Sequence, residues 1–252
     1  MVISFANNKG GVGKTTLAYN TGGILASLGY KVLMIDMDGQ CSLTSIYKLN
    51  KAPKTIYDTL VNRETLVYYE VTENLYCCPS NINMSALDAD MASRPGREYY
   101  LRRALSDNNV FDFVLCDCPP NIGISTMNAL TASDYCVIAL ESRYLSATNL
   151  SVIIDLISDI RGIVNSGLKI AGIAMTRFKG QERAAKKIRD EVCNNIDIPM
   201  FRTMIRESSA VGEAPMFGMD ILRYQKGSIG AMDHLNFTKE LIETIGYGKE
   251  RH

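Results

Sequence analysis

The segment NNKGGVGKTT, residues 7–16, has the residue types and spacing of a phosphate-binding loop. In such a loop, backbone N–H groups surround a nucleotide's phosphates, a lysine reaches the β and γ phosphates, and the next hydroxyl binds Mg²⁺. Gly13, Lys14 and Thr15 occupy these places. The residues that we expect to contact the nucleotide in this loop are Gly10, Gly11, Val12, Gly13, Lys14, Thr15 and Thr16.

Two positions of the loop depart from the strict pattern. Asn8 stands where the pattern has its first glycine, and Lys9 is a second lysine. The alternative interpretations are a glycine-rich turn that binds nothing and a solvent-exposed lysine. The position of the loop between a predicted strand and a predicted helix favours the phosphate site, because a helix N-terminus adds its positive dipole end.

Two further segments place carboxylates after apolar runs. In IDMDGQCSLT, Asp36 and Asp38 lie two residues apart where a predicted strand ends, and in VLCDCPP another strand ends at Asp117. Phosphoryl hydrolysis requires, besides a phosphate loop, a carboxylate that supports Mg²⁺ and one that orients water. Taken alone, the first segment is equally compatible with a turn, since Asp-Gly is a common turn pair and Ser42 could cap a helix.

Alternating strands and helices must position these groups. Apolar runs predict strands at 2–6, 31–36, 111–117, 135–140 and 169–176, with a shorter one in NLYCCPS. Helical patterns fill the gaps, from TTLAYNTGGILASLG to SIGAMDHLNFTKELIETIG. This order predicts an α/β fold, a mostly parallel twisted sheet with helices on both faces. The polar segments then meet at the carboxyl edge of the sheet, where such folds bind ligands.

The composition predicts one domain. A chain of 252 residues, 46% of them hydrophobic, can bury one sizeable core, and no segment resembles a linker, so we expect a single domain over residues 1–252. Neither a leader nor a membrane-spanning run is expected, which predicts a cytoplasmic protein. The seven cysteines show no metal-ligand spacing. The net charge is zero, so nucleic-acid binding would need a local basic patch.

The segments KGGVGKTT, VLMIDMDGQCSLT, DFVLCDCPPNIG, NALTASD and GEAP together resemble the ParA/Soj family of DNA-partitioning ATPases, relatives of MinD. The resemblance covers nearly the whole chain. It implies a P-loop fold of the deviant Walker A type, an ATP-dependent homodimer and slow ATP hydrolysis with Mg²⁺. It also implies non-specific binding of the ATP-bound dimer to double-stranded DNA, stimulation by a ParB-like centromere-binding partner, and association with the nucleoid. No N-terminal helix-turn-helix domain is expected.

The resemblance also gives individual residues their roles. Lys9 matches the family's signature lysine, Lys14 its phosphate lysine and Asp38 the residue that orients the attacking water. In a two-fold dimer, Lys9 of one subunit can reach the phosphates held by the other and stabilise charge there, as an arginine finger does. The positions implied at or near the metal are Thr15, Asp36 and Asp117.

Three regions depart from the family's pattern. Asp38-Gly39-Gln40-Cys41-Ser42 stands where the family usually has Asp-Pro-Gln-Gly-Asn, which we expect to loosen the loop and to affect the rate of hydrolysis. Arg177 and Arg206 lie in the regions expected to contact the base, where an apolar residue and a Pro-Arg-Asn sequence are frequent. Both arginines could stack on a purine as flat cations, or form surface ion pairs.

One basic segment offers a surface for DNA. Residues 177–189 contain six basic residues and a single acid, Glu182. Arg183, Lys186 and Lys187 share one helix face by their spacing, which suits phosphate contacts that do not read bases. The alternative is an ordinary solvated helix face.

Two other classes share this type of loop. A MinD-like positioning ATPase would end in an amphipathic membrane helix, whereas TKELIETIGYGKERH is typical of a packed terminal helix, so no membrane partner is expected. A nucleotide-dependent iron–sulfur protein would need cysteine ligands. Cys116 and Cys118 flank Asp117, but a cysteine after that aspartate is ordinary in the DCPP motif of the partitioning family.

Overall fold

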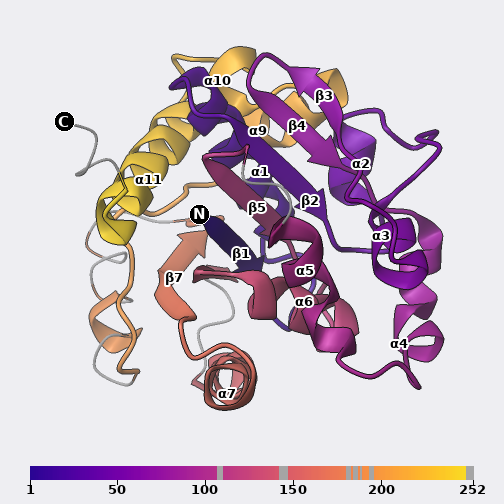
Figure 1. Ribbon diagram of the computed structural model, residues 1–252. Coiled ribbons are helices and arrows are strands. Elements are labelled where there is room, and N and C mark those ends of the chain that lie inside the picture. The colour runs from indigo at the N-terminus through magenta and orange to yellow at the C-terminus, as the bar shows by residue number, and fades with distance from the viewer. Residues whose placement is uncertain are drawn as a thin grey trace.

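The computed structural model describes residues 1–106, 110–141, 147–179, 183, 187, 189–192 and 196–247. Its centre is a seven-stranded sheet in the order β3-β4-β2-β5-β1-β6-β7 (Figure 1). All neighbouring strands in this sheet are parallel except β3 and β4. The strands are β1 (Val2–Ala6), β2 (Val32–Asp36), β3 (Tyr69–Thr72), β4 (Leu75–Cys78), β5 (Phe113–Asp117), β6 (Tyr135–Glu141) and β7 (Lys169–Thr176).

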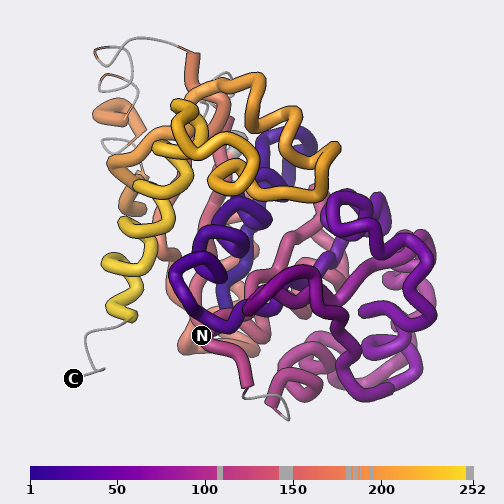
Figure 2. Tube along the Cα trace, turned by 90° about the horizontal axis from the view of Figure 1, so that it is seen from above, coloured from indigo at the N-terminus to yellow at the C-terminus, as the bar shows by residue number. Residues whose placement is uncertain are grey.

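Helices cover both faces of the sheet, which confirms the predicted α/β class. On one face, α1 (Lys14–Ser27) and α11 (Ile229–Ile245) pack against each other (Figure 2). The other face carries α5 (Tyr100–Ser106), α6 (Ile124–Ala132) and α7 (Ala147–Ile163). The shorter elements are α2 (Ser42–Ile46), α3 (Ile56–Asn62), α4 (Leu87–Asp90), α9 (Ser209–Glu213) and α10 (Ile221–Tyr224), with the 3-10 turns η1 (Ile82–Ala86), η2 (Arg97–Tyr99) and η4 (Ala214–Phe217).

Strand β2 shows why the central strands are unbroken apolar runs. Leu33 and Ile35 pack into the core beneath α5, α6 and α7, while Val32 and Met34 pack into the core beneath α1 and α11. All four side chains are completely buried. A parallel strand covered by helices on both faces has no solvent side, so the hydrophobic alternation of a half-exposed strand is absent.

The elements that the sequence pattern missed are short or lie at the edge of the sheet. Strand β3 pairs only with β4, in the antiparallel direction, and none of its residues is fully buried. Its sequence, YEVT, therefore has no apolar run to mark it. Helix α2 has five residues and α4 has four, too few for a helical period to stand out.

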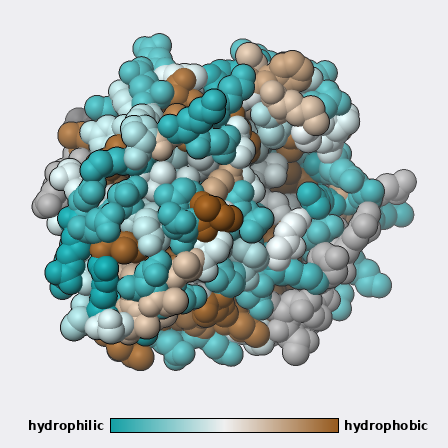
Figure 3. All heavy atoms as spheres, turned by 90° about the vertical axis from the view of Figure 1, so that its right-hand side faces the viewer, coloured by the Kyte–Doolittle hydropathy of each residue, from teal (hydrophilic) through white to brown (hydrophobic). Residues whose placement is uncertain are grey.

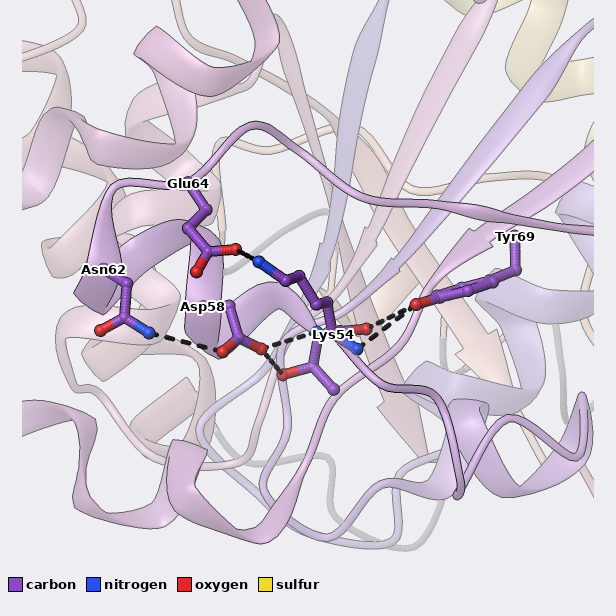
Figure 4. Close-up of polar contacts among 6 residues, drawn as sticks. Lys54, Asp58, Asn62, Glu64 and Tyr69 are labelled. Carbon is purple, nitrogen blue, oxygen red and sulfur yellow. Dashed lines mark hydrogen bonds and ion pairs between the residues drawn. The ribbon is translucent and has the colours of Figure 1, made fainter.

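Helix α3 is fixed at its start by the contacts drawn in Figure 4. The Asp58 carboxylate accepts hydrogen bonds from the backbone N–H and the hydroxyl of Thr55, at 2.8 and 3.1 Å, and Lys54 pairs with Glu64. Thr55 and Asp58 together form a capping box, which satisfies donors that a helix start leaves unpaired. The Thr55 hydroxyl also accepts a 2.7 Å bond from Asn81, which follows β4. The cap thereby links α3 to the carboxyl edge of the sheet.

The surface around α2, α3 and α4 is mostly hydrophilic, with apolar side chains in small separate groups (Figure 3). Within the described ranges, no helix combines the length and the apolar character that crossing a membrane would require.

Candidate active site

The loop of residues 7–16 leaves the carboxyl end of β1 and leads into α1. Its first residue, Asn7, is buried and ties the loop to the sheet: the side-chain amide donates to the Ala139 carbonyl on β6 at 2.6 Å, and its oxygen accepts from the Lys9 N–H at 3.0 Å. Gly11 and Gly13 have φ angles of 77° and 85°. Glycine adopts this left-handed conformation without steric cost, so the sequence can turn back and begin α1 at Lys14.

Lys14 points into the protein rather than into solvent. Its side chain is 6% exposed, and Nζ donates to the Lys9 carbonyl oxygen at 2.9 Å. Burial lowers the pKa of Lys14, and the nearby Asp117, Cys118 and Asp38 oppose this shift. A cation held at the start of a helix, with its ammonium inside the loop, is suited to a phosphate group.

A residue that the sequence analysis did not select, Thr176, supports the loop from behind. Its hydroxyl lies at the end of β7 and contacts the Val12 carbonyl oxygen at 2.6 Å. A Cβ atom added at Gly13 would lie 3.4 Å from this threonine. The signal in the sequence was its place as the last residue of the strand predicted at 169–176, at the same edge as the other polar strand ends.

Asp117 is a buried carboxylate without a hydrogen bond. It is 1% exposed, and neither of its oxygens has a hydrogen-bond partner in the part of the chain that the structure describes. Burial and the neighbouring Asp36 raise the pKa of Asp117 well above its usual range. The nearby Thr15 hydroxyl and Lys14 offset part of this rise in the pKa. Leaving a buried polar group unpaired is costly, so this carboxylate is suited to a cation delivered with a ligand.

The described residues could bind Mg²⁺ only together with water and the phosphates of a ligand. Nowhere in the described ranges do three His, Cys, Asp or Glu side chains gather closely enough to hold a metal ion by themselves. Mg²⁺ is usually bound by one or two protein groups together with waters and the substrate's phosphates. Thr15 and Asp117, at the start of α1 and the end of β5, could supply that protein part.

Asp36 is already engaged by the protein. One carboxyl oxygen accepts from the backbone N–H and hydroxyl of Thr44, at 2.8 and 2.7 Å, and the other from the Asp38 N–H at 3.1 Å. Burial raises the pKa of Asp36 to about 6, against the lowering effect of these bonds. Asp36 thus fixes the start of α2 relative to β2, and its place near a metal stays a prediction.

Asp38 lies in the loop between β2 and α2, half-buried, and accepts a 2.9 Å bond from the Gln40 N–H. The preceding residue, Met37, anchors this loop beside Asp117: its N–H donates to the Asp117 carbonyl oxygen at 3.0 Å, and its own carbonyl accepts from the Ser125 hydroxyl at 2.5 Å. The structure therefore holds the Asp38 loop against the strand that ends in Asp117.

Gly39 does not loosen this loop, which corrects the expectation from the sequence. It is buried, and a Cβ atom placed on it would lie 2.3 Å from Oγ and 2.8 Å from the backbone nitrogen of Ser85 in η1. Contacts of this length do not occur, so glycine is the residue that lets η1 pack on the loop.

A cleft of about 350 Å³ opens beside the phosphate loop. Gly13 and Thr16 form one wall, and both arginines that we expected near a base, Arg177 and Arg206, line it. The guanidinium of Arg206 forms a two-point ion pair with Asp233, at 2.9 and 2.6 Å. The structure thus brings these arginines next to the loop, and Arg206 takes the ion-paired form.

The predicted DNA-binding residues are only partly described. Arg183 and Lys187 are helical and exposed, as expected, whereas Lys186 lies outside the described residues. Nearby, Lys179 forms an ion pair with Glu207 at 2.6 Å. Arg183 and Lys187 are therefore accessible to a polyanion.

Comparison with known proteins identifies the family to which this chain belongs. A family model described as an AAA domain matches residues 1–170. The chromosome-partitioning ATPase Soj of Treponema pallidum is 30% identical, over 97% of this chain and 98% of its own. The sporulation initiation inhibitor protein Soj of Bacillus subtilis is 32% identical, over 95% of this chain and 97% of its own. The chain belongs to the Soj/ParA family of ATPases.

A solved structure agrees with this family assignment. Cobyrinic acid a,c-diamide synthase from Mycobacterium smegmatis, determined with a bound ATP analog and magnesium, superposes with a TM-score of 0.85 at 28% identity and covers 98% of this chain and 96% of its own. In this chain, which belongs to the Soj/ParA family, the segment NNKGGVGKTT follows β1, the position that the P-loop fold requires.

Sequence reasoning also missed a residue of the cleft. The sequence analysis did not select His234 on α11, yet this residue is 1% exposed and lines the cleft with Gly13 and Thr16. No local pattern in the sequence separates an inward-facing histidine from an outward-facing one at this position of an amphipathic helix. Its orientation depends on how α11 packs against α1.

Proposed function

We propose that this chain is an ATP-driven, dimerising switch of a DNA-partitioning system. The observation that carries the proposal is the pair of lysines in one loop. Lys14 is buried beside Asp117, whereas Lys9 is half-buried next to the exposed Gly10 and Gly11. A lysine that serves the loop's own phosphates and a second one on its outer side suit a two-fold dimer in which each subunit contributes to the other's site.

The substrate proposed for the site is ATP. Its phosphates would lie against the backbone N–H groups of residues 10–16, and its base would occupy the cleft lined by Arg177 and Arg206. Thr15 and Asp117 would hold Mg²⁺, which when bound neutralises charge on the phosphates. The ATP analog and magnesium bound to the Mycobacterium smegmatis synthase support this choice of ligands.

Hydrolysis in this proposal depends on two groups from two subunits. Asp38 orients the attacking water, and the partner subunit's Lys9 stabilises the charge that develops on the transferred phosphoryl group. The fixed position of the Asp38 loop, held through Met37 and packed on η1 at Gly39, supports a positioning role. We expect slow turnover, as the family resemblance implies.

The output proposed for the switch is reversible binding to DNA in the cytoplasm. The ATP-bound dimer would present two copies of the exposed Arg183 and Lys187, so that phosphate contacts are doubled and binding requires ATP. A ParB-like centromere-binding protein would stimulate hydrolysis and release the dimer. The names of the relatives, which include chromosome-partitioning ATPases, support this assignment.

The decisive experiment measures dimerisation and DNA binding in parallel. Sedimentation with and without ATP reports the dimer, and fluorescence anisotropy of a random-sequence duplex reports DNA binding as salt is varied. The double variant Arg183→Glu/Lys187→Glu should still dimerise with ATP but lose DNA binding. Arg102→Glu/Lys239→Glu, which reverses two exposed basic residues on α5 and α11, is the charge-matched control and should bind normally.

Three other results of this experiment would change the proposed function. An unchanged salt dependence in Arg183→Glu/Lys187→Glu would move the DNA surface to the region of Arg206 and Arg223. ATP-dependent binding to anionic lipid vesicles, without DNA binding, would replace the partitioning function with a MinD-like positioning function. If the parent protein stays monomeric in the presence of ATP, the proposal of an ATP-driven dimerising switch is wrong.

A further inference from the structure

His234 is a buried side chain whose polar atoms are unused by the protein. It lies in α11, is 1% exposed, and neither Nδ1 nor Nε2 has a hydrogen-bond partner among the residues described. Its own backbone carbonyl is satisfied, since it accepts a 2.8 Å bond from the Thr238 hydroxyl. At this residue the backbone carbonyl is thus paired, whereas the two imidazole nitrogens are not.

An imidazole in this state is costly for the folded protein. Nearly all buried polar groups in proteins have a hydrogen-bond partner, and an orphaned one loses its hydration without compensation. An apolar side chain of similar size would fill the same volume without that cost. A histidine at this position is thus explained if a ligand supplies the missing partner.

The cleft that His234 lines indicates which ligand could supply the missing hydrogen-bond partner. His234 lines the same 350 Å³ cleft as Gly13 and Thr16, so the ring and the phosphate loop belong to one continuous site. The neighbouring wall is rigid, because the Asp233 carboxylate accepts three bonds from Arg206, one from its backbone N–H at 3.0 Å and two from its guanidinium. A group that extends from the phosphates into this cleft comes beside His234, whose ring nitrogens are covered in this structure, so the side chains over them must move for a hydrogen bond to form.

We propose that His234 hydrogen-bonds the edge of the nucleotide's base and so makes binding depend on the base as well as on the phosphates. This inference rests on the proposed function, because it places ATP in the site. It adds a base-recognition residue to a loop that by itself contacts only phosphates.

The protonation state of the ring fits this role. Burial lowers the pKa of His234 to about 4, and the adjacent Asp233 offsets only part of the shift. The imidazole is therefore neutral at pH 7, with one nitrogen that donates and one that accepts. A neutral ring of this kind can pair with the donor and acceptor atoms on the edge of a purine.

The test compares ATP with inorganic tripolyphosphate, which has no base. Calorimetric titration with Mg²⁺ is carried out on the parent protein, on His234→Leu, and on His234→Gln, which keeps a donor and an acceptor. His234→Leu should bind ATP about 3- to 10-fold more weakly, the value of one hydrogen bond, with unchanged tripolyphosphate affinity. His234→Gln should restore most of the ATP affinity. Thr238→Val, one turn along α11, is the packing control and should leave the ratio unchanged.

A second measurement needs no variant at residue 234. The chain has two histidines, so ¹⁵N-histidine labelling together with His252→Gln leaves His234 as the source of the imidazole signals. These signals should shift when ATP binds and stay in place when tripolyphosphate binds. Signals that ATP does not move, or an ATP-to-tripolyphosphate ratio that His234→Leu does not change, would overturn the inference while leaving the proposed ATPase intact. A parent protein that binds neither ligand would instead reject the proposed function, and this inference with it.

Discussion

The ammonium group of Lys14 donates a hydrogen bond to the backbone carbonyl of Lys9, across 2.9 Å. The buried lysine of the loop thus fixes the backbone from which the second lysine extends. Because Lys14 also lies near Asp117, one side chain connects the loop's outer segment with the carboxylate at the end of β5. The two lysines of KGGVGKTT are therefore structurally coupled but differ in position, and their substitution should have different effects.

Substitution of the two lysines should separate nucleotide binding from dimerisation. Lys14→Ala removes the ammonium inside the loop and its bond to the Lys9 carbonyl, so ATP binding should be lost. Lys9→Ala keeps that carbonyl, so ATP binding should persist while dimerisation fails and hydrolysis falls by about 10³-fold or more, as for a lost arginine finger. Titration with a fluorescent ATP analogue and light scattering measure the two properties. Normal ATP-dependent dimers of Lys9→Ala would exclude its role in trans.

Asp38→Ala should trap the ATP-bound dimer. The contacts that bind ATP remain, whereas the group that positions water is removed, so hydrolysis should fall by about 10²- to 10⁴-fold and the dimer should accumulate. Phosphate release and sedimentation with ATP provide the readout. Should Asp38→Ala hydrolyse ATP at the parent rate, the catalytic role would pass to another carboxylate, with Asp36 the next candidate.

Asp117→Asn should stabilise the free protein and impair its use of Mg²⁺. The pKa of Asp117 is raised in the folded state, so the folded protein loses stability as pH rises from the carboxyl's unfolded pKa through its higher folded pKa. Asparagine removes the buried charge, and the free energy of unfolding should exceed that of the parent at pH 7 and match it more closely at pH 3. Denaturant titrations without nucleotide measure this. If Mg²⁺ still enhances ATP binding to Asp117→Asn as in the parent, Asp117 does not support the metal.

Gly39→Ala should destabilise the protein and slow hydrolysis. The new methyl group would overlap the backbone nitrogen of Ser85, and relieving the overlap should cost about 1–3 kcal/mol and displace the loop that carries Asp38. Gly162→Ala in α7, where an added methyl group meets nothing within 4 Å, is the matched control and should be neutral or slightly stabilising. Thermal unfolding and phosphate release test both. Equal behaviour of the two variants would show that η1 does not constrain the loop.

His234 should make the free protein sensitive to mild acid. Its pKa is about 4 in the folded protein and near 6.5 in the unfolded chain, so between these values the unfolded chain binds a proton that the folded protein does not. The free energy of unfolding should therefore fall by up to about 3 kcal/mol as pH drops from 6.5 to 4. Asp36, with its raised pKa, acts in the opposite direction, so the quantity to measure is the difference between the parent and His234→Leu. A difference that stays constant with pH would show that the histidine is not held neutral.

The fold class, the strand ends that carry the polar residues and the phosphate loop could all be predicted from the amino-acid sequence. Those features follow from local chemistry: unbroken apolar runs such as VLMID form strands buried on both faces, and glycine at residues 11 and 13 adopts the left-handed turn into α1 without steric cost. The carboxyl ends of parallel strands meet at one edge, so Asp36 and Asp117 could be placed at the same edge from the sequence, whereas the strand order that makes β2 and β5 neighbours comes from the structure. The register of β2 and β5 pairs these two residues directly.

The contacts of those groups, by contrast, depend on the packing of the whole fold. Asp36 and Asp117 look alike in sequence, each ending an apolar strand, yet Thr44 and the Asp38 N–H engage one while the other has no hydrogen-bond partner in the described part of the chain. The inward orientation of His234 depends on the packing of α11, and the need for glycine at residue 39 depends on η1, some 45 residues further along the chain. Contacts between distant segments depend on how whole elements pack, and no local pattern of residue types encodes them.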